Sequence, residues 1–304
     1  MAASMSSEAP DHKINRAKFY FEYKGHPLSD LATFLDITRA ERPGKPIVYL
    51  AGDSSLDNKF WLHKSIEDIN PIPKPDVSFW LNHLLGERAT CINTAVEESM
   101  IRERSQQLIS HDEFIRDNMT SDDVLIVSVG GNDVAFKPNA CTIFNMLRLA
   151  WLTPRRNLEN GTASALGYFK NMFCDQVQEY VAKMTAKTKP RAVIVCMIYY
   201  PLEAQHGQSS WSDKQLTALR YDSDPGQLQA AIRAMYRIAT CEIRVEGTRI
   251  VPCALYDVMD GKSGDDYTER VEPNEEGGRK MAMRFMESLD EVLGLETSST
   301  EKQV

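Results

Sequence analysis

The sequence predicts an α/β protein built around a parallel β-sheet. Five short apolar segments of strand character alternate with longer segments of helical period; they are 46–51, 90–95, 124–129, 192–198 and 249–255. These segments are continuously apolar rather than alternating, which is typical of strands buried on both faces of a parallel sheet. The chain has 304 residues, of which 42% are hydrophobic and 26% are charged. That composition is typical of a globular protein with a sizeable core.

Three of the intervening segments have the period and the ends of amphipathic helices. Segment 166–184 carries an apolar stripe on one helix face. Asp224 and Pro225 predict the N-cap and first turn of a second helix, and Asn274 predicts the N-cap of a third, which Gly294 ends. The stripe of the first helix consists of Phe169, Phe173, Val177 and Val181.

The charge distribution and the ends of the chain indicate the general class of protein. With 35 basic and 43 acidic residues, the net charge is −8, so nucleic acid or an anionic membrane is not expected to be the main partner. No apolar segment is long enough for stable membrane insertion, and the N-terminus lacks a secretory signal, so we expect a cytoplasmic protein. We expect one domain over 46–295, after a partly disordered N-terminal extension (1–45) and before a disordered tail (296–304).

The cysteine pattern gives no sign of a metal site or a disulfide framework. The six cysteines are widely spaced, without a C-x-x-C motif or Cys/His pairing, so we expect reduced thiols and no bound metal. No glycine-rich nucleotide motif follows a strand, so we expect no dinucleotide or P-loop cofactor. The cysteines are Cys91, Cys141, Cys174, Cys196, Cys241 and Cys253.

Polar residues follow two of the predicted strands, at the edge where parallel sheets place their chemistry. Gly52, Asp53 and Ser54 follow the first strand. A serine on a strand-to-helix turn exposes its hydroxyl above the sheet, with backbone N–H groups directed at developing negative charge. The alternative is an ordinary N-cap serine after a glycine turn.

The third strand is followed by Gly130, Gly131, Asn132 and Asp133. The glycines permit unusual backbone angles, and an asparagine amide can donate a hydrogen bond to an oxyanion. This motif alone would be an ordinary loop. Because it occurs together with the Ser54 turn, at the ends of two strands of one sheet, a shared site is the better interpretation.

Together these motifs resemble the SGNH hydrolase superfamily, also called GDSL-type esterases and lipases, over residues 46–293. The resemblance implies that Ser54 is the nucleophile, in a block with Gly52 and Asp53. It also implies that Asn132 donates to the oxyanion, in a block with Gly130, Gly131 and Asp133. The implied fold is a three-layer αβα sandwich with the flavodoxin-like strand order 2-1-3-4-5. The implied activity is ester hydrolysis through an acyl-serine, without metal or cofactor.

Two family blocks depart from the pattern, and the first lies near Glu98. Glu98 stands where the family has a glycine whose N–H joins the oxyanion hole. A carboxylate beside an oxyanion is repulsive unless it turns to solvent. One interpretation is an altered oxyanion hole. The favoured alternative is a helix N-terminus bearing acidic residues that suit its dipole.

The second departure is the absence of the family's catalytic histidine. Alignment on Pro273 places Glu272 at the histidine position, with Glu269 or Asp266 as the supporting acid. We expect burial beside Glu269, and the neighbouring carboxylate itself, to raise the Glu272 pKa. It should stay below the pKa of histidine, so that activity would persist to lower pH than in a histidine-based esterase. The alternatives are a structural ion pair, in which Arg270 or Arg279 neutralises the two glutamates, and His206 as the base, although a loop histidine is more often merely solvated.

Segment 136–161 follows the third strand and is rich in apolar residues. It is interpreted as a lid or acyl pocket, with an ordinary core helix as the alternative. The sequence as a whole predicts a serine esterase acting on a small-molecule or lipid-like ester. The rival is a catalytically inactive SGNH-fold binding or scaffold protein. The two differ in whether Ser54 has a basic partner within hydrogen-bond reach.

Overall fold

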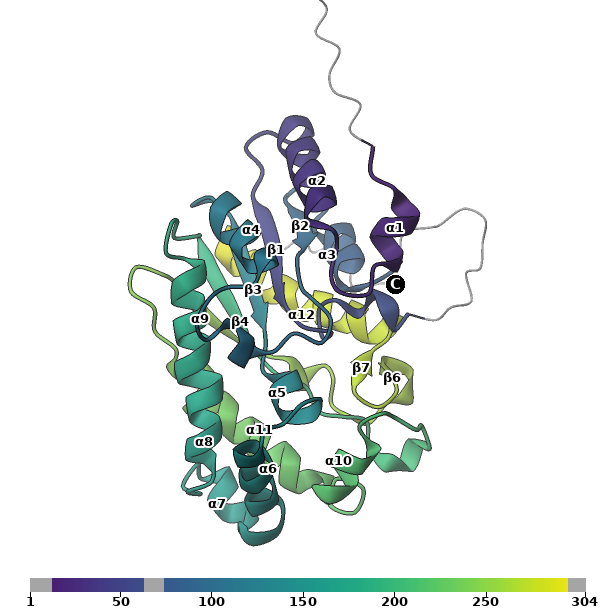
Figure 1. Cartoon of the computed structure of the whole chain (residues 1–304), viewed down its shortest axis with the longest axis vertical. Helices are drawn as coiled ribbons and strands as arrows, with labels where there is room; N and C mark the ends of the chain where they lie inside the picture. Colours follow the sequence, from purple (N-terminus) through teal and green to yellow (C-terminus); the bar gives the residue numbers. More distant parts are fainter. Residues whose placement is uncertain (1–12, 63–73, 295–304) are drawn as a thin grey trace, which may run out of the picture.

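The computed structural model describes residues 13–62 and 74–294, and it has a five-stranded parallel sheet at its centre (Figure 1). The strand order is β2-β1-β3-β4-β5, so the predicted fold class and the strand order implied by the resemblance are confirmed. Each strand lies within two residues of its predicted segment. The strands are β1 (Ile47–Gly52), β2 (Thr90–Asn93), β3 (Val124–Ser128), β4 (Ala192–Met197) and β5 (Ile250–Ala254).

The first four strands are fully buried, as their continuous apolar sequences predicted. β1 lies between β2 and β3, and its last residue, Gly52, pairs with Ser128 of β3. A Cβ atom at Gly52 would lie 2.1 Å from the Ser128 carbonyl oxygen. Only glycine therefore permits the two strands to approach this closely where the polar loops begin.

One face of the sheet is covered by helices from four parts of the chain, which share one buried apolar cluster. The predicted helix 166–184 forms one helical run whose middle is π-helical. Its predicted stripe is buried. The helix predicted at Pro225 also begins there, but the Asp224 side chain pairs with Arg155 instead of capping it. The elements are α2 (Leu28–Glu41), α4 (Ser110–Asn118), α8 (Leu166–Lys170), η4 (Asn171–Gln176), α9 (Val177–Met184) and α11 (Pro225–Ile238).

The opposite face is covered by α3 (Val77–Leu85) and α12 (Glu275–Leu293), which pack against a second apolar cluster. In Figure 1, α12 runs across the sheet in yellow. Asn274 caps α12 as predicted, since its side chain accepts a hydrogen bond from the Gly277 N–H at 3.1 Å. Gly294 ends the helix in the left-handed region, with φ 63°.

The remaining elements are short, and several of them surround the carboxyl edge of the sheet. A two-stranded hairpin, β6 (Tyr267–Thr268) and β7 (Glu272–Pro273), precedes α12 and was not predicted. The short helices are α1 (Arg16–Phe21), α5 (Gly131–Ala135), α6 (Ala140–Leu147), α7 (Arg155–Glu159), α10 (Asp213–Ala218), η1 (Asn58–Phe60), η2 (Ile101–Arg104), η3 (Arg148–Leu152), η5 (Ala204–His206), η6 (Thr240–Glu242), η7 (Leu255–Asp257) and η8 (Gly264–Asp266).

The described part of the predicted N-terminal extension, residues 13–45, packs against the sheet. Leu31 and Leu35 of α2 are buried in the apolar cluster that also contains Tyr49 of β1. The Gly25 N–H donates to Asp57 Oδ2 at 3.1 Å, just beyond β1. Residues 1–12, within the extension predicted to be partly disordered, and the predicted disordered tail 296–304 lie outside the described residues.

The described residues also have features that bear on the chemical requirements of a disulfide, a metal site and a membrane-spanning helix. All six cysteines are free thiols. Within 13–62 and 74–294, no group of three or more His, Cys, Asp or Glu side chains is arranged to hold a metal ion. The helices in these ranges also include none that combines the length and apolar character needed to cross a bilayer.

Candidate active site

The candidate site lies at the carboxyl ends of β1 and β3, which are neighbours in the sheet as predicted. Ser54 follows β1, and Asn132 lies in the first turn of α5, which follows β3. Each is only 7% exposed, and both line the same cavity. The two sequence motifs therefore meet at one place, although they are far apart in the chain.

The turn that carries Ser54 is fixed by its neighbours. The Asp53 carboxylate accepts a hydrogen bond from the Ser55 N–H at 3.1 Å. The Ser55 and Ser128 hydroxyls lie 2.7 Å apart, which ties the turn to β3. Ser54 does not cap a helix, because the next helical segment is η1, with Asp57 at its N-cap position. The alternative interpretation of Ser54 as an N-cap is therefore wrong.

Glu272 is placed beside Ser54 by the β6–β7 hairpin. Glu269 and Arg270 occupy the left-handed region in the hairpin turn, with φ 53° and 60°. Glu272 is 3% exposed, and its Oε1 accepts a hydrogen bond from Trp211 Nε1 at 3.3 Å. The Ser54 hydroxyl is near enough to lower the carboxyl pKa by hydrogen bonding. The Ser54 hydroxyl does not form a full hydrogen bond with this carboxylate. Glu272 Oε2 is buried without a fully formed hydrogen-bond partner among the described residues.

Burial raises the pKa of Glu272 to about 8. The nearby Ser54 hydroxyl and the hydrogen bond from Trp211 lower it, and the charges of Asp53 and Glu269 raise it. The expectation that the pKa of Glu272 would stay below that of histidine is therefore wrong. Both burial and the neighbouring carboxylates were expected to raise this pKa, but the extent of the loss of solvation, the larger effect, depends on how deeply the hairpin is buried, which the sequence does not show.

The two predicted supporting acids have other partners. Glu269 Oε2 accepts a hydrogen bond from the Trp211 backbone N–H at 3.3 Å, so it supports the tryptophan that holds Glu272. Asp266 is buried and forms an ion pair with Lys280 of α12 at 2.7 Å. Asp266 therefore secures the start of the hairpin to the final helix.

Among its described residues, the structure shows neither the ion pair that would make Glu272 a structural residue nor a hydrogen bond between His206 and Ser54. Arg270 pairs with Asp213 at 3.0 Å and with Asp222 at 2.8 Å, and Arg279 pairs with Glu276 at 2.7 Å. Neither arginine forms an ion pair with Glu269 or Glu272 in the described part of the chain. His206 is exposed in η5, where its ring lies near Gly264, and no hydrogen bond joins that ring to Ser54 within the described ranges.

The segment around Glu98 forms a tight turn, so the favoured interpretation as a helix N-terminus is wrong. Glu98 itself has φ 61°, a conformation that costs a non-glycine residue about 1–2 kcal/mol. Its carboxylate accepts a hydrogen bond from the Tyr23 hydroxyl and pairs with Lys24, both at 3.3 Å. These partners belong to the N-terminal segment.

Asn132 connects this turn to the site. Its Nδ2 donates to the Ser99 carbonyl oxygen at 3.1 Å. An amide NH₂ group has two protons, so the second can serve an oxygen in the cavity. Gly130 precedes it with φ 97°, and a Cβ atom there would lie 2.7 Å from the Phe173 ring. Asp133 accepts hydrogen bonds from the N–H groups of Ile101 and Arg102, so its role is to hold the segment after the turn.

Two residues near Glu272 were missed by sequence reasoning. Trp211, described above, comes from a loop 61 residues before Glu272, and no motif marks it. Glu97 is 4% exposed, and its Oε2 accepts a hydrogen bond from Trp61 Nε1 at 3.3 Å. Burial, followed by the charges of Glu272 and Asp57, raises the pKa of Glu97 to about 9. The sequence does not indicate this burial, because Glu97 and Glu98 stand side by side as an acidic pair.

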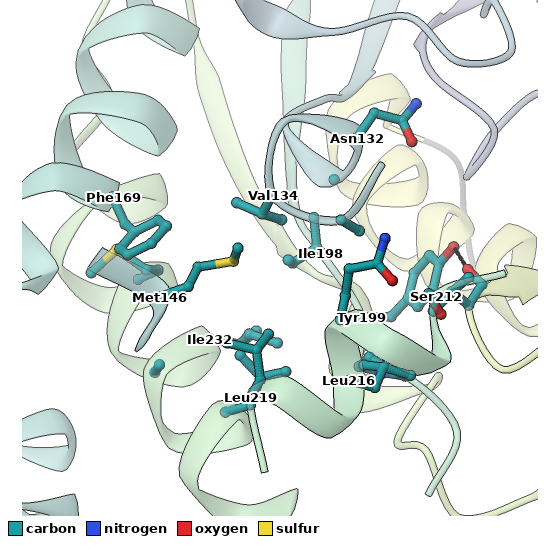
Figure 2. Close-up of a pocket in the computed structure, with 18 of the residues that line it drawn as sticks. Asn132, Val134, Met146, Phe169, Ile198, Tyr199, Ser212, Leu216, Leu219 and Ile232 are labelled. Carbon is teal, nitrogen blue, oxygen red and sulfur yellow. Dashed lines mark hydrogen bonds between the residues drawn. The ribbon is translucent and has the colours of Figure 1, made fainter. Parts of the chain in front are cut away.

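An apolar cavity of about 160 Å³ opens beside Ser54, Asn132 and Glu272. Figure 2 shows Met146 beside Phe169 on one side, with Leu216 and Ile232 from other helices around the same space. Segment 136–161 contributes Met146, Leu149 and Ala150 to the lining. The arrangement thus combines a hydroxyl, a buried carboxyl and an amide donor at the mouth of an apolar space.

Comparisons with known proteins find likeness in solved structures only. No family model matches the chain, and no curated protein matches it at a significant level. A lipase from a goat rumen metagenome is 13% identical, with a TM-score of 0.49 over 80% of this chain and 97% of that chain. A putative SGNH hydrolase from Slackia heliotrinireducens is 12% identical, with a TM-score of 0.42 over 81% and 100%.

A third solved structure is an aryl esterase from M. smegmatis in an inhibitor-bound form. It is 11% identical, with a TM-score of 0.44 over 82% of this chain and 100% of that chain. At these identities and TM-scores, neither an activity nor a site is carried from those proteins to this one.

Proposed function

We propose that the protein is a serine-dependent ester hydrolase that acts through an acyl-serine on Ser54. The observation that carries the proposal is the buried Glu272 carboxyl beside the Ser54 hydroxyl, at the mouth of an apolar cavity. A hydroxyl is a weak nucleophile until a positioned base removes its proton. Glu272, held by Trp211, is that base.

In the first half of the reaction, Ser54 Oγ attacks the ester carbonyl carbon while its proton moves to Glu272. The carbonyl oxygen becomes an oxyanion, which accepts a hydrogen bond from Asn132 Nδ2. The tetrahedral intermediate collapses, the bond to the alcohol oxygen breaks, and Glu272 returns the proton to that oxygen. The products of this half are a free alcohol and an acyl-serine.

In the second half, a water molecule takes the place of the alcohol. Glu272 accepts a proton from the water, whose oxygen attacks the acyl carbon, and the proton then returns to Ser54 Oγ as the acid leaves. The same carboxyl thus serves as base and acid in each half. Side chains fill every role, so we propose that the reaction needs neither a metal nor another cofactor.

The cavity indicates which acyl groups fit. An engineered apolar cavity of about 150 Å³ binds benzene, and the cavity here is about 160 Å³. We therefore propose an acyl or aryl group of about six carbons inside the cavity. The alcohol part, or the remainder of a longer chain, would lie toward the mouth.

Labelling with a fluorophosphonate probe tests the proposal. At pH 9, where the Glu272 carboxyl is ionised, the wild-type protein should form a covalent adduct, and Ser54→Ala should not. Ser223→Ala, which removes an exposed hydroxyl outside the cavity lining, is the matched control and should keep its label. If the folded wild-type protein is not labelled, the inactive binding or scaffold protein becomes the better assignment.

A further inference from the structure

An exposed apolar surface lies on the segment that contains α6 and η3. Of the eight large hydrophobic side chains that are exposed in the described ranges, five lie within ten consecutive residues of this segment. We call these five side chains the α6–η3 face. They are Ile143 at 44%, Phe144 at 62%, Leu147 at 39%, Trp151 at 59% and Leu152 at 77% exposure. A contiguous apolar surface of this kind marks an interaction site.

The other side of the same segment lines the cavity beside Ser54. Leu149 and Ala150 are buried, and together with Met146 they form part of the cavity wall. Figure 1 places α6 at the lower end of the molecule, and Figure 2 shows Met146 pointing into the cavity beside Phe169. A single helical layer therefore separates the exposed face from the proposed acyl site.

Positive charge is concentrated at this face. Segment 136–161 contains four basic residues and one acidic residue, in a chain of net charge −8. The Arg148 guanidinium lies 5.5 Å from the Phe144 ring centroid, and that of Arg220 lies 5.1 Å from the Trp151 ring centroid. Arg155 is neutralised by Asp224, whereas Arg148 and Arg220 place positive charge directly over the aromatic rings of the face.

We propose that the α6–η3 face docks on an anionic lipid bilayer. Exposed apolar and aromatic side chains enter the boundary between headgroups and acyl chains, and nearby arginines meet lipid phosphates. Trp151 suits this position, since its indole N–H already donates to the Ala218 carbonyl oxygen at 2.9 Å and its exposed ring can enter the apolar boundary without an unpaired donor. The local charge thus favours a partner that the net charge of the whole chain disfavours. Docking there would bring lipid esters to the mouth of the cavity; this last step rests on the proposed function, whereas the docking does not.

Vesicle sedimentation tests the docking with the full-length Ser54→Ala protein, which cannot consume ester lipids by the proposed route. We expect it to bind vesicles of phosphatidylcholine and phosphatidylserine about fivefold or more tightly than vesicles of phosphatidylcholine alone. The double variant Phe144→Glu/Leu152→Glu should bind about tenfold or more weakly. Both substituted side chains are largely exposed, so the fold should be retained. Met283→Glu, at an apolar residue of α12 that is 48% exposed, is the matched control and should bind normally.

Tryptophan emission provides a second measurement at the face itself. Binding to anionic vesicles should shift the emission to shorter wavelength, and Trp151→Phe should remove most of this shift while sedimentation persists. Equal binding to both vesicle types, or unchanged binding by the double variant, would overturn the proposal. So would a stable dimer that forms through this face in the absence of lipid and does not bind vesicles. A wild-type protein that docks normally but hydrolyses no ester would refute only the proposed function.

Discussion

Replacing the proposed base, Glu272→Gln, changes its chemistry with little change of shape. The glutamine Oε1 can still accept the hydrogen bond from Trp211 Nε1, which Glu272 accepts at 3.3 Å. It cannot take a proton from Ser54. The turnover of a small activated ester should therefore fall by about 100-fold or more, the usual cost of losing a general base.

The same substitution should stabilise the protein at high pH. Burial raises the pKa of Glu272 from 4.5 to about 8. Between these values the folded state holds a proton that the unfolded state has lost, so the free energy of unfolding falls by about 1.4 kcal/mol per pH unit. The wild-type protein thus loses about 5 kcal/mol across this window, and the glutamine variant does not. The two should be equally stable at and below pH 4.5.

Urea unfolding at pH 5, 7 and 9 and ester turnover across the same range test both expectations. The stability difference should grow from about 1 kcal/mol at pH 5 to about 5 kcal/mol at pH 9. The wild-type rate should rise with pH through a midpoint near 8, because ionised Glu272 is the active form. Glu275→Gln, at an exposed position of the α12 first turn, is the control and should change neither quantity.

A stability difference that is the same at pH 5 and pH 9 would refute the buried state of Glu272. A midpoint near 6.5 in the wild-type rate would indicate an imidazole base. Normal turnover by a folded Glu272→Gln protein would refute its role as the base, even if the stability result holds. The two measurements therefore separate burial from catalysis.

Three further substitutions test other parts of the site. Trp211→Phe removes a hydrogen bond that lowers the Glu272 pKa, so the midpoint of the rate profile should move above that of the wild type; an unmoved midpoint would exclude Trp211 as a positioning residue. Gly52→Ala places a Cβ atom 2.1 Å from the Ser128 carbonyl oxygen and should destabilise the protein by about 3 kcal/mol in urea unfolding. Gly167→Ala, in α8 with open space around it, should instead stabilise it slightly, and equal effects would contradict the close approach of β1 and β3. Lys59→Met leaves the buried Asp57 carboxylate unpaired and should cost about 3–5 kcal/mol, whereas Asp57→Asn combined with Lys59→Met should recover part of that loss in the same assay.

The sheet could be predicted because its signal is local. β1 and β3 are uninterrupted apolar runs, and parallel burial on both faces produces this pattern in any sequence. The place of the polar residues after these strands could be predicted for the same reason, since parallel strands end at the same edge of the sheet. The motifs at Ser54 and Asn132 could therefore be assigned to one edge from the sequence.

The environment of the base could not be predicted, because it depends on contacts between distant parts of the chain. The β6–β7 hairpin has strands of two residues each, which is too short for a periodic signal. Trp211 reaches Glu272 from another loop, and the burial that raises the pKa of Glu272 depends on how the hairpin packs on the rest of the chain. The left-handed Glu98 was misinterpreted for a related reason. Its acidic sequence suits a helix N-terminus. The contacts that accompany the turn are made by Tyr23 and Lys24, which precede β1 in the chain, whereas Glu98 follows it.

The contacts of the Asp57 carboxylate determine which residues before β1 a shortened protein must retain. It accepts the N–H groups of both Gly25 and Glu97, so a single side chain joins the N-terminal segment to the turn beside the candidate site. An expression clone that starts at β1 would remove Gly25, together with the Tyr23 and Lys24 partners of Glu98. It would also uncover the surface that Leu31 and Leu35 bury. A shortened clone, or a chimera that exchanges the part before β1, would therefore alter the site itself, and the smallest useful unit for either purpose begins before Tyr23.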